Sequence, residues 1–277
     1  MTMDLSDGLI SLVVTTYNRP DALAAVMAGC FAQSDMRFEI IIADDGSGPT
    51  TLACIERMKT FAPVPLSHVW QEDRGFRASM SRNRGIALAK GDYIVLLDGD
   101  CVPQRDFIAR HRALAQANCM VTGSRVLVKE AATARVLNEH IALYELDRAA
   151  LLRLRLDGDI NKVLPLLIKV PDVAREHRRF SWRRIKSCNM GVWRSDLEKV
   201  NGFDESFVGW GHEDADLAVR LHNAGVKRKD GAFATEVFHL WHREEKRDQE
   251  SSNRSTVMAR EHDGTIQAIK GLHNGDR

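Results

Sequence analysis

The sequence predicts an α/β protein built on a doubly wound, mostly parallel sheet with helices on both of its faces. Short runs of branched apolar residues, such as residues 9–16, alternate with longer segments whose apolar residues recur at helical spacing, such as residues 21–33. The runs are apolar throughout, which is typical of strands that are buried on both faces of a parallel sheet. Strands that alternate with helices in this way imply right-handed crossover connections.

This alternation is clearest at the start of the chain. We expect strands over residues 9–16, 38–43, 66–70 and 93–97, and helices over residues 21–33, 51–61 and 79–90. Pro20 suits the first turn of the first helix, where no partner is needed for the missing N–H. Gly91 is expected to end the third helix, since glycine favours the position just after a helix.

The rest of the chain is less regular. We expect helices over residues 103–116, 131–156 and 213–224, strands over residues 120–128, 187–194 and 233–239, and a charged tail from residue 243 that is helical or partly mobile. Gly225 is expected to terminate the third of these helices.

The composition is that of an ordinary globular protein. The chain has 277 residues, of which 44% are hydrophobic, and its formal charge of +1 gives no general attraction to nucleic acid. Its five cysteines form no Cys-x-x-Cys pair, which fits reduced thiols in a cytoplasm. No apolar run approaches the ~20 residues that span a bilayer, and the first residues are too polar for a secretory signal. We therefore expect a cytoplasmic protein.

Two carboxylates follow the most apolar of the predicted strands. Asp98 and Asp100 flank Gly99 at the point where the strand over residues 93–97 ends. Ligands of open α/β sheets bind at the carboxyl ends of the strands, and two carboxylates there can hold a divalent cation. Asp-Gly is also common in turns, and the triplet taken alone favours that simpler interpretation.

Further polar residues fall at the same predicted edge. Asp44 and Asp45 follow the second strand, and Arg77 and Arg82 lie near the start of the third helix. These arginines either face solvent, as most arginines do, or contact an anionic ligand beside the acids.

A tryptophan and a run of acids open the predicted helix near residue 213. Trp210 and Gly211 precede Glu213, Asp214 and Asp216. Acids in a first helical turn commonly cap N–H groups and complement the helix dipole. That role does not account for the tryptophan. An indole beside carboxylates is suited to a sugar, because the indole supports the ring while the carboxylates bind its hydroxyls.

Histidines and a basic segment complete the candidates. His239, at the end of the last predicted strand, is a candidate third metal ligand, and His242 lies just behind it. Residues 175–186 combine arginines with two aromatics, which suits phosphates, an anionic lipid surface or an acidic substrate. A solvated insertion accounts for this segment equally well.

In order and spacing, these motifs resemble those of the family 2 glycosyltransferases of the GT-A fold, in the branch with a galactosyltransferase-like C-terminal segment. Each motif is weak alone, but the combination is specific and covers most of the chain. The motifs are residues 13–19, 44–47, 75–77, 81–85, 98–100, 201–205 and 210–214. The resemblance implies one continuous GT-A domain with a nucleotide-sugar-binding half over residues 1–125. Its acceptor-binding and catalytic half covers residues 126–277, with a basic insertion near residues 157–186.

The resemblance also implies roles for individual residues. The donor site comprises Thr16, Tyr17, Arg19, Asp44, Asp45, Arg77, Arg82 and Asp98. The metal site, for Mn²⁺ or Mg²⁺, comprises Asp100 and His239, with Asp98 as a further candidate. The acceptor site comprises Trp210, Gly211, Glu213 and Asn189. Asp214 is the implied catalytic base, and Glu213 assists it on the acceptor sugar.

The residue types suit this chemistry. A cation held by carboxylate and imidazole neutralises a diphosphate leaving group, and a carboxylate base accepts the proton of the attacking hydroxyl. Related retaining enzymes have asparagine where this chain has Asp214, so the acid favours inversion. The implied reaction moves a hexose or N-acetylhexosamine from a UDP-sugar to a glycan or lipid-linked glycan in bacterial surface polysaccharide or lipopolysaccharide synthesis. Its location is the cytoplasm, or the inner face of the plasma membrane if residues 175–186 contact lipid.

Two other functions would be compatible with a similar sheet. A nucleotidyltransferase would share the sheet but needs a glycine-rich phosphate loop after the first strand, and residues 15–20 contain no glycine. The alternative from another class is a degenerate transferase fold that binds a nucleotide sugar or a glycan without turnover. The presence of Asp98, Asp100, His239 and Asp214 together argues against it.

Overall fold

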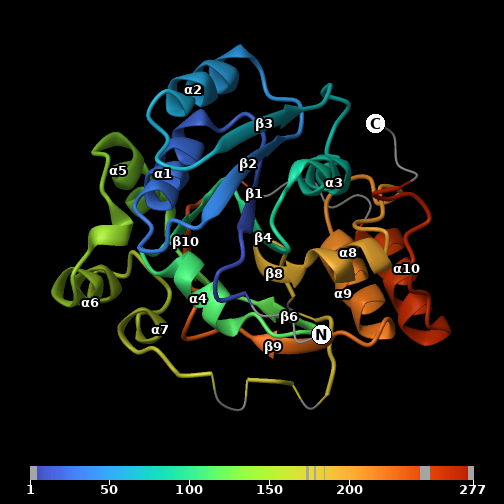
Figure 1. Cartoon of the computed structure of the whole chain (residues 1–277). Helices are drawn as coiled ribbons and strands as arrows, with labels where there is room; N and C mark the ends of the chain where they lie inside the picture. Colours follow the sequence, from blue (N-terminus) through green and yellow to red (C-terminus); the bar gives the residue numbers. More distant parts are fainter. Residues whose placement is uncertain (1–4, 173–174, 178, 184, 244–249, 274–277) are drawn as a thin grey trace.

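The computed structural model describes residues 5–172, 175–177, 179–183, 185–243 and 250–273, and at its centre lies a seven-stranded sheet (Figure 1). In spatial order the strands are β3 (Leu66–Trp70), β2 (Phe38–Asp44), β1 (Ile10–Thr16), β4 (Tyr93–Asp98), β8 (Asn189–Trp193), β6 (Cys119–Thr122) and β9 (Lys227–Asp230). The predicted α/β class and central sheet are confirmed.

The parallel half of this sheet brings three strand ends to one edge. β1 pairs with β2 and β4, so that Thr16 lies opposite Asp44 and Thr15 opposite Asp98. β8 runs antiparallel to β4 and starts beside its carboxyl end. The acids that follow β2 and β4 therefore lie at a common edge, as expected for parallel strands.

Alternate residues of β1 face two layers of helices. Leu12 and Val14 pack into one apolar core, and Val13 packs into a second core on the other face. The first layer comprises α1 (Pro20–Phe31), α2 (Pro49–Lys59) and α4 (Phe107–Leu114), and the second comprises α3 (Ala78–Leu88), α8 (Arg194–Lys199) and α9 (Glu213–Asn223). α10 (Glu250–Asp263) lies against α9 (Figure 1). Pro20 opens α1 and Gly225, at φ 93°, follows α9, both as predicted.

A small three-stranded sheet begins directly after β4. Its order is β5 (Cys101–Pro103), β10 (Val237–His239) and β7 (Arg125–Leu127). β10 pairs with β5 so that His239 lies opposite Cys101. This pairing brings a late part of the chain to the end of β4.

Two long predicted elements are wrong because the chain turns within them. Residues 120–128 form β6 and β7 in different sheets, and the chain leaves β6 at Gly123, where a Cβ would lie 2.2 Å from the side chain of Asn189. The predicted helix over residues 131–156 is divided into α5 (Glu130–Asn138), the 3₁₀ turn η1 (Leu143–Glu145) and α6 (Arg148–Leu156). His140 follows α5 in the left-handed conformation at φ 52°, which interrupts the helix.

Several boundaries also differ from the prediction. The helix expected over residues 103–116 starts at Phe107, because the preceding residues form β5, and the strand expected over residues 233–239 is confined to β10. α3 ends before Gly91, whose Cβ would lie 2.5 Å from the backbone oxygen of Leu9, so this glycine permits close packing. β9 was not predicted, because its four residues are all charged.

The middle segment is anchored to the body of the protein. After α7 (Leu164–Leu167), the buried Arg175 donates hydrogen bonds to the backbone carbonyls of Asp230 and Ala232. The indole of Trp182 is also buried and donates to Glu261 of α10 at 2.8 Å. Part of the predicted basic surface thus serves internal packing, while Arg178 and Arg184 lie outside the described residues. Within the described ranges, no helix combines the length and apolar character needed to cross a bilayer.

Candidate active site

The acids after β4 flank a tight turn against β1. The Gly99 N–H donates to the backbone oxygen of Thr15 at 2.7 Å, and a Cβ on Gly99 would lie 2.8 Å from that oxygen. This close approach requires glycine. The triplet is therefore a turn, as the simpler interpretation held, and the turn presents Asp98 and Asp100 at the strand end.

Two histidines face the carboxylate of Asp100. Nε2 of His242 lies 3.3 Å from one of its oxygens, and Nε2 of His239 lies 3.7 Å from the other. The pairing of β10 with β5 places His239 there, and His242 follows three positions later. The sequence left the choice between the two histidines open, and the fold brings both to the same carboxylate.

The chemistry of this cluster fits a divalent cation. A carboxylate and neutral imidazoles are ligands that suit Mn²⁺. Burial lowers the pKa of His239, although the charge of Asp100 opposes this effect, so the imidazole is neutral at neutral pH. Cys101 also has its sulfur within 4.8 Å of the ligand atoms, but burial raises the pKa of its thiol, which disfavours the thiolate that metals bind.

Asp44, at the end of β2, is buried and fully engaged by its neighbours. It accepts a hydrogen bond from the backbone N–H of Ser47 at 2.8 Å and lies 3.2 Å from Nε2 of His68. Burial would raise the pKa of Asp44, but these two partners lower it overall. Asp44 thus stays ionised and holds the loop after β2 in place.

Asp45 joins that loop to the start of α3. It accepts hydrogen bonds from the Gln71 amide at 2.5 Å and from the backbone N–H of Arg77 at 2.8 Å. Burial raises the pKa of Asp45, and these bonds oppose the rise. The predicted donor residues Asp45 and Arg77 are therefore neighbours.

The last residue of β1 has a free polar group. The buried hydroxyl of Thr16 has no hydrogen-bond partner among the described residues, which leaves it available to a ligand. Tyr17 donates to Asp73 at 2.9 Å. Arg19 pairs with Asp21 at 3.0 Å at the start of α1, so its guanidinium is directed to that helix rather than to the acids of the site.

Arg82 connects the end of β4 to the start of α9. Its guanidinium lies 3.0 Å from Asp98 and 3.1 Å from Glu213. Burial alone would lower the pKa of Arg82, but the two carboxylates raise it, so the side chain keeps its charge. The side chain of Arg82 is only 5% exposed, so the interpretation that this arginine faces solvent is wrong.

The first turn of α9 presents two buried acids. Burial raises the pKa of Glu213, the charge of Asp214 adds to this effect, and Arg82 opposes it. Asp214 accepts a hydrogen bond from the backbone N–H of Ser187 at 3.4 Å, just before β8. His212, in the left-handed conformation at φ 73°, precedes both acids and directs the chain into the helix.

Trp210 lies half-buried beside this helix start. Nζ of Lys186 is 5.7 Å from the centroid of the Trp210 ring. The carbonyl of the adjacent Gly211 accepts a hydrogen bond from Asn253 of α10 at 2.9 Å. The loop that carries the tryptophan is thus fixed by two other segments.

The third acid of α9 has a structural role. Asp216 is fully buried and accepts hydrogen bonds from Arg220 at 2.8 Å and Arg260 at 2.6 Å, while Arg260 also bonds Asp204 at 2.6 Å. This network ties α9 and α10 to the turn over residues 201–205. Sequence reasoning missed Arg220 and Arg260, because no local pattern marks them as buried.

Asn189, predicted on the acceptor side, is buried and its side chain is hydrogen-bonded within the core. Its side-chain N–H groups donate to the carbonyls of Thr235 and Ser124, and its oxygen lies 3.1 Å from Nε2 of His111. The structure therefore brings Asn189 close to the end of β4 but leaves its amide no free polar group for a sugar.

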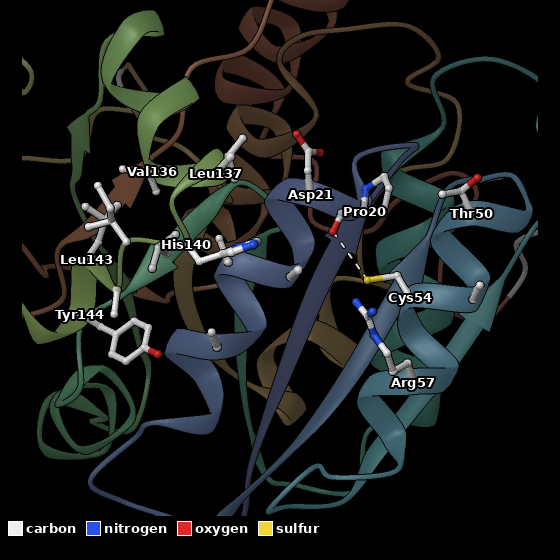
Figure 2. A pocket seen from close by; sticks show the side chains of 17 residues that line it. Pro20, Asp21, Thr50, Cys54, Arg57, Val136, Leu137, His140, Leu143 and Tyr144 are labelled. Atoms are coloured by element: carbon white, nitrogen blue, oxygen red, sulfur yellow. Dashed lines mark hydrogen bonds between the residues drawn. The ribbon is translucent and has the colours of Figure 1, made fainter.

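An apolar cavity of about 660 Å³ lies apart from these acids. It is bounded by α1, α2 and the α5–η1 segment, and Figure 2 shows Arg57 on one side of α1 and His140 and Tyr144 on the other. The residues that line this cavity do not include the acids Asp98, Asp100, Glu213 and Asp214. It is not part of the candidate active site.

Two protein-family profiles match the chain. The family described as "Glycosyl transferase family 2" matches residues 11–174, which is more than half of the sequence. The family described as "N-terminal domain of galactosyltransferase" matches residues 172–243, which include the start of α9 and both histidines.

Curated relatives are longer than this chain. Validoxylamine A glucosyltransferase of Streptomyces hygroscopicus subsp. limoneus is 29% identical over 231 residues, which are 79% of this chain and 49% of that protein. Hyaluronan synthase of Pasteurella multocida is 30% identical over 243 residues, which are 81% of this chain and 24% of that protein. The chain thus spans half or less of the length of these relatives.

Solved structures share the fold at low sequence identity. GalNAc-T7 with UDP, GalNAc and Mn²⁺ has a TM-score of 0.64 at 15% identity, covering 92% of this chain and 48% of that chain. The mannosyltransferase PcManGT from Pyrobaculum calidifontis, in complex with GDP-Man and Mn²⁺, has a TM-score of 0.58 at 17% identity, covering 95% and 66%. These likenesses show the GT-A fold that the sequence predicts.

Proposed function

The chain belongs to glycosyl transferase family 2, and we propose that it is an inverting, divalent-metal-dependent glycosyltransferase. The proposed donor is a UDP-sugar that carries a hexose or an N-acetylhexosamine, and the proposed acceptor is a hydroxyl of a glycan or lipid-linked glycan. One observation carries the proposal: Arg82 contacts both Asp98, beside the Asp100 and histidine cluster, and Glu213, beside Asp214.

On the donor side, Asp100, His239 and His242 are the residues that would hold Mn²⁺ or Mg²⁺. Such an ion, when bound, supplies Lewis-acid neutralisation of the diphosphate. The hydroxyl of Thr16, which lacks a partner in the described part of the chain, is available to the nucleotide. Asp45, which accepts a hydrogen bond from the backbone N–H of Arg77, is the proposed partner of the base.

On the acceptor side, Asp214 is the proposed base that accepts the proton of the attacking hydroxyl. Glu213 binds a second hydroxyl of the acceptor sugar, and Trp210 supports the apolar face of its ring. Arg82 opposes the rise in the pKa of Glu213 that burial causes, which favours the ionised, hydrogen-bond-accepting form.

The names of several relatives support a polysaccharide pathway. Hyaluronan synthase of Pasteurella multocida and chondroitin synthase of Escherichia coli both align over about four fifths of this chain. We propose an acceptor of the same general class, a growing surface glycan. The cytoplasmic location remains a prediction of the sequence.

The decisive experiment is turnover of a panel of UDP-sugars by the purified protein with Mn²⁺, with and without glycan acceptors. We expect release of UDP that stops on addition of EDTA and resumes when Mn²⁺ is restored. Binding of a UDP-sugar without turnover under any of these conditions would instead establish the non-catalytic binding module. An Asp100→Asn variant should lose the metal-dependent turnover, whereas Asp263→Asn, on the exposed end of α10, should keep it.

A further inference from the structure

An arginine that the motifs do not include lies on the small sheet beside the histidines. Arg125 is on β7, where it is opposite Val237 of β10, and Leu127 is opposite His239. Side chains alternate along a strand, so Arg125 and His239 belong to the same face of the small sheet. Val126, between Arg125 and Leu127, lies on the other face of the small sheet and is fully buried.

The charge of Arg125 acts on the acids after β4. Burial alone would lower the pKa of the half-buried guanidinium, but the nearby cysteines and the carboxylates of Asp98 and Asp100 raise it overall. The same charge adds to burial in lowering the pKa of His239. Arg125 is therefore close to the groups that face a metal-bound ligand.

Arg125 differs from Arg82 and Arg260 in having no hydrogen-bond or ion-pair partner among the described residues. Arg82 donates hydrogen bonds to Asp98 and Glu213, and Arg260 donates hydrogen bonds to Asp204 and Asp216. No hydrogen bond or ion pair is found for the guanidinium of Arg125 within the described ranges. Arg125 is only half-buried, and none of its nitrogen atoms is among the buried polar atoms that lack a partner, so the guanidinium stays accessible to a ligand.

The charges of the proposed reaction call for such a group. The diphosphate of a nucleotide sugar carries roughly two negative charges, and roughly three once the sugar has left. A divalent ion bound to Asp100 keeps a surplus of only about one positive charge, and Arg82 is already neutralised by two carboxylates. Among the described residues, Arg125 is a cation near Asp98 and Asp100 that forms no ion pair with a carboxylate.

We propose that Arg125 binds the β-phosphate of the donor and stabilises the nucleoside diphosphate as it leaves. This inference rests on the proposed function and adds a phosphate-binding residue to it. The guanidinium offers paired N–H donors that match two phosphate oxygens, and the charge on those oxygens grows during the reaction.

The test compares UDP with UMP, because only UDP has a β-phosphate. Dissociation constants for both nucleotides with Mn²⁺ are measured by calorimetry for the wild type, Arg125→Gln and Arg125→Lys. We expect Arg125→Gln to weaken UDP binding by ~10- to 100-fold with little change for UMP. Arg125→Lys should be intermediate, since it keeps the charge but loses the planar donor pair. The matched control Arg153→Gln, on the exposed face of α6, should change neither constant.

A second measurement uses the wild type alone and is independent of variant folding. Phenylglyoxal modifies accessible arginines, and mass spectrometry reports the extent of modification at Arg125. We expect UDP with Mn²⁺ to protect Arg125 and UMP with Mn²⁺ to protect it less. Equal effects on UDP and UMP in the variants, or equal protection, would overturn the role of Arg125 while the proposed function stands. A wild type that binds no UDP with Mn²⁺ would contradict the UDP-dependent function and this inference together.

Discussion

The guanidinium of Arg82 and the carboxylate of Glu213 lie 3.1 Å apart in the interior, although 131 positions separate them in the sequence. The same guanidinium contacts Asp98 at 3.0 Å. One charged group therefore sets the position of the proposed donor side relative to the proposed acceptor side. Its removal should affect stability and catalysis together.

We expect Arg82→Gln to lower the free energy of unfolding by about 3 kcal/mol, because it leaves the buried Glu213 carboxylate without its cation. The measurement is urea unfolding at pH 7. Arg84→Gln is the matched control and should cost less than ~1 kcal/mol, because Arg84 lies on the same helix but, among the described residues, bonds the backbone oxygen of Trp70 rather than a carboxylate. Similar losses in the two variants would show that the bridge does not stabilise the fold.

The neighbouring acids Asp214 and Asp216 should respond differently to the same substitution. Asp214→Asn is expected to keep its thermal stability and donor affinity but to lose ~100- to 10,000-fold in transfer rate, because the amide cannot accept the proton. The measurements are kcat, UDP-sugar affinity and Tm. Full activity of Asp214→Asn would remove it as the base.

Asp216→Asn is expected to lower the free energy of unfolding by about 3 kcal/mol, since Arg220 and Arg260 would remain buried beside a neutral group. Denaturant unfolding measures this loss, and the fraction that remains folded should retain donor affinity. A stable but inactive Asp216→Asn variant would contradict the structural role of this network.

Removal of either histidine beside Asp100 should weaken Mn²⁺ binding. We expect at least a ~10-fold loss of affinity for His239→Ala and for His242→Ala, because each imidazole would donate one ligand atom. Titration with Mn²⁺ by calorimetry checks this expectation. His262→Ala, exposed on α10, serves as control, and unchanged affinity in His242→Ala would restrict the site to His239.

His111 of α4 should make the fold sensitive to acid. It is fully buried, and burial lowers its pKa from 6.5 to about 4. Between these values the unfolded chain binds a proton that the folded chain does not, so the free energy of unfolding falls as the pH decreases from 6.5 to 4. The loss from this group should reach about 3 kcal/mol.

Urea unfolding of the wild type and His111→Gln at pH 7 and pH 4.5 measures the contribution of His111. The glutamine variant should be less stable at pH 7 but should lose less stability on acidification. His262→Gln should follow the wild type. An identical pH dependence in wild type and His111→Gln would show that this histidine does not cause the acid sensitivity.

Local patterns were enough to predict the parallel half of the sheet. The apolar runs of β1, β2 and β4 end at Thr16, Asp44 and Asp98, and parallel strands necessarily bring these ends to one edge. The alternation of residues along β1 explains why helices cover both faces. Where the pattern failed, as at Gly123 and His140, a turn is imposed by contacts or by a backbone conformation that no repeat reveals.

The partners of the candidate residues depend on tertiary contacts. Residue type and position at a strand end predicted Asp98, Asp100 and His239 as candidates. The pairing of β10 with β5 is what brings His239 and His242 to Asp100, and the shared apolar core of α3 and α9 is what brings Glu213 to Arg82. Hydrogen bonds to Thr235, Ser124 and His111 engage Asn189 in the core, and pairing of β7 with β10 places Arg125 on the small sheet near the acids. These are pairings between distant parts of the chain, and their free energy comes from burial that exists only when the whole fold is formed.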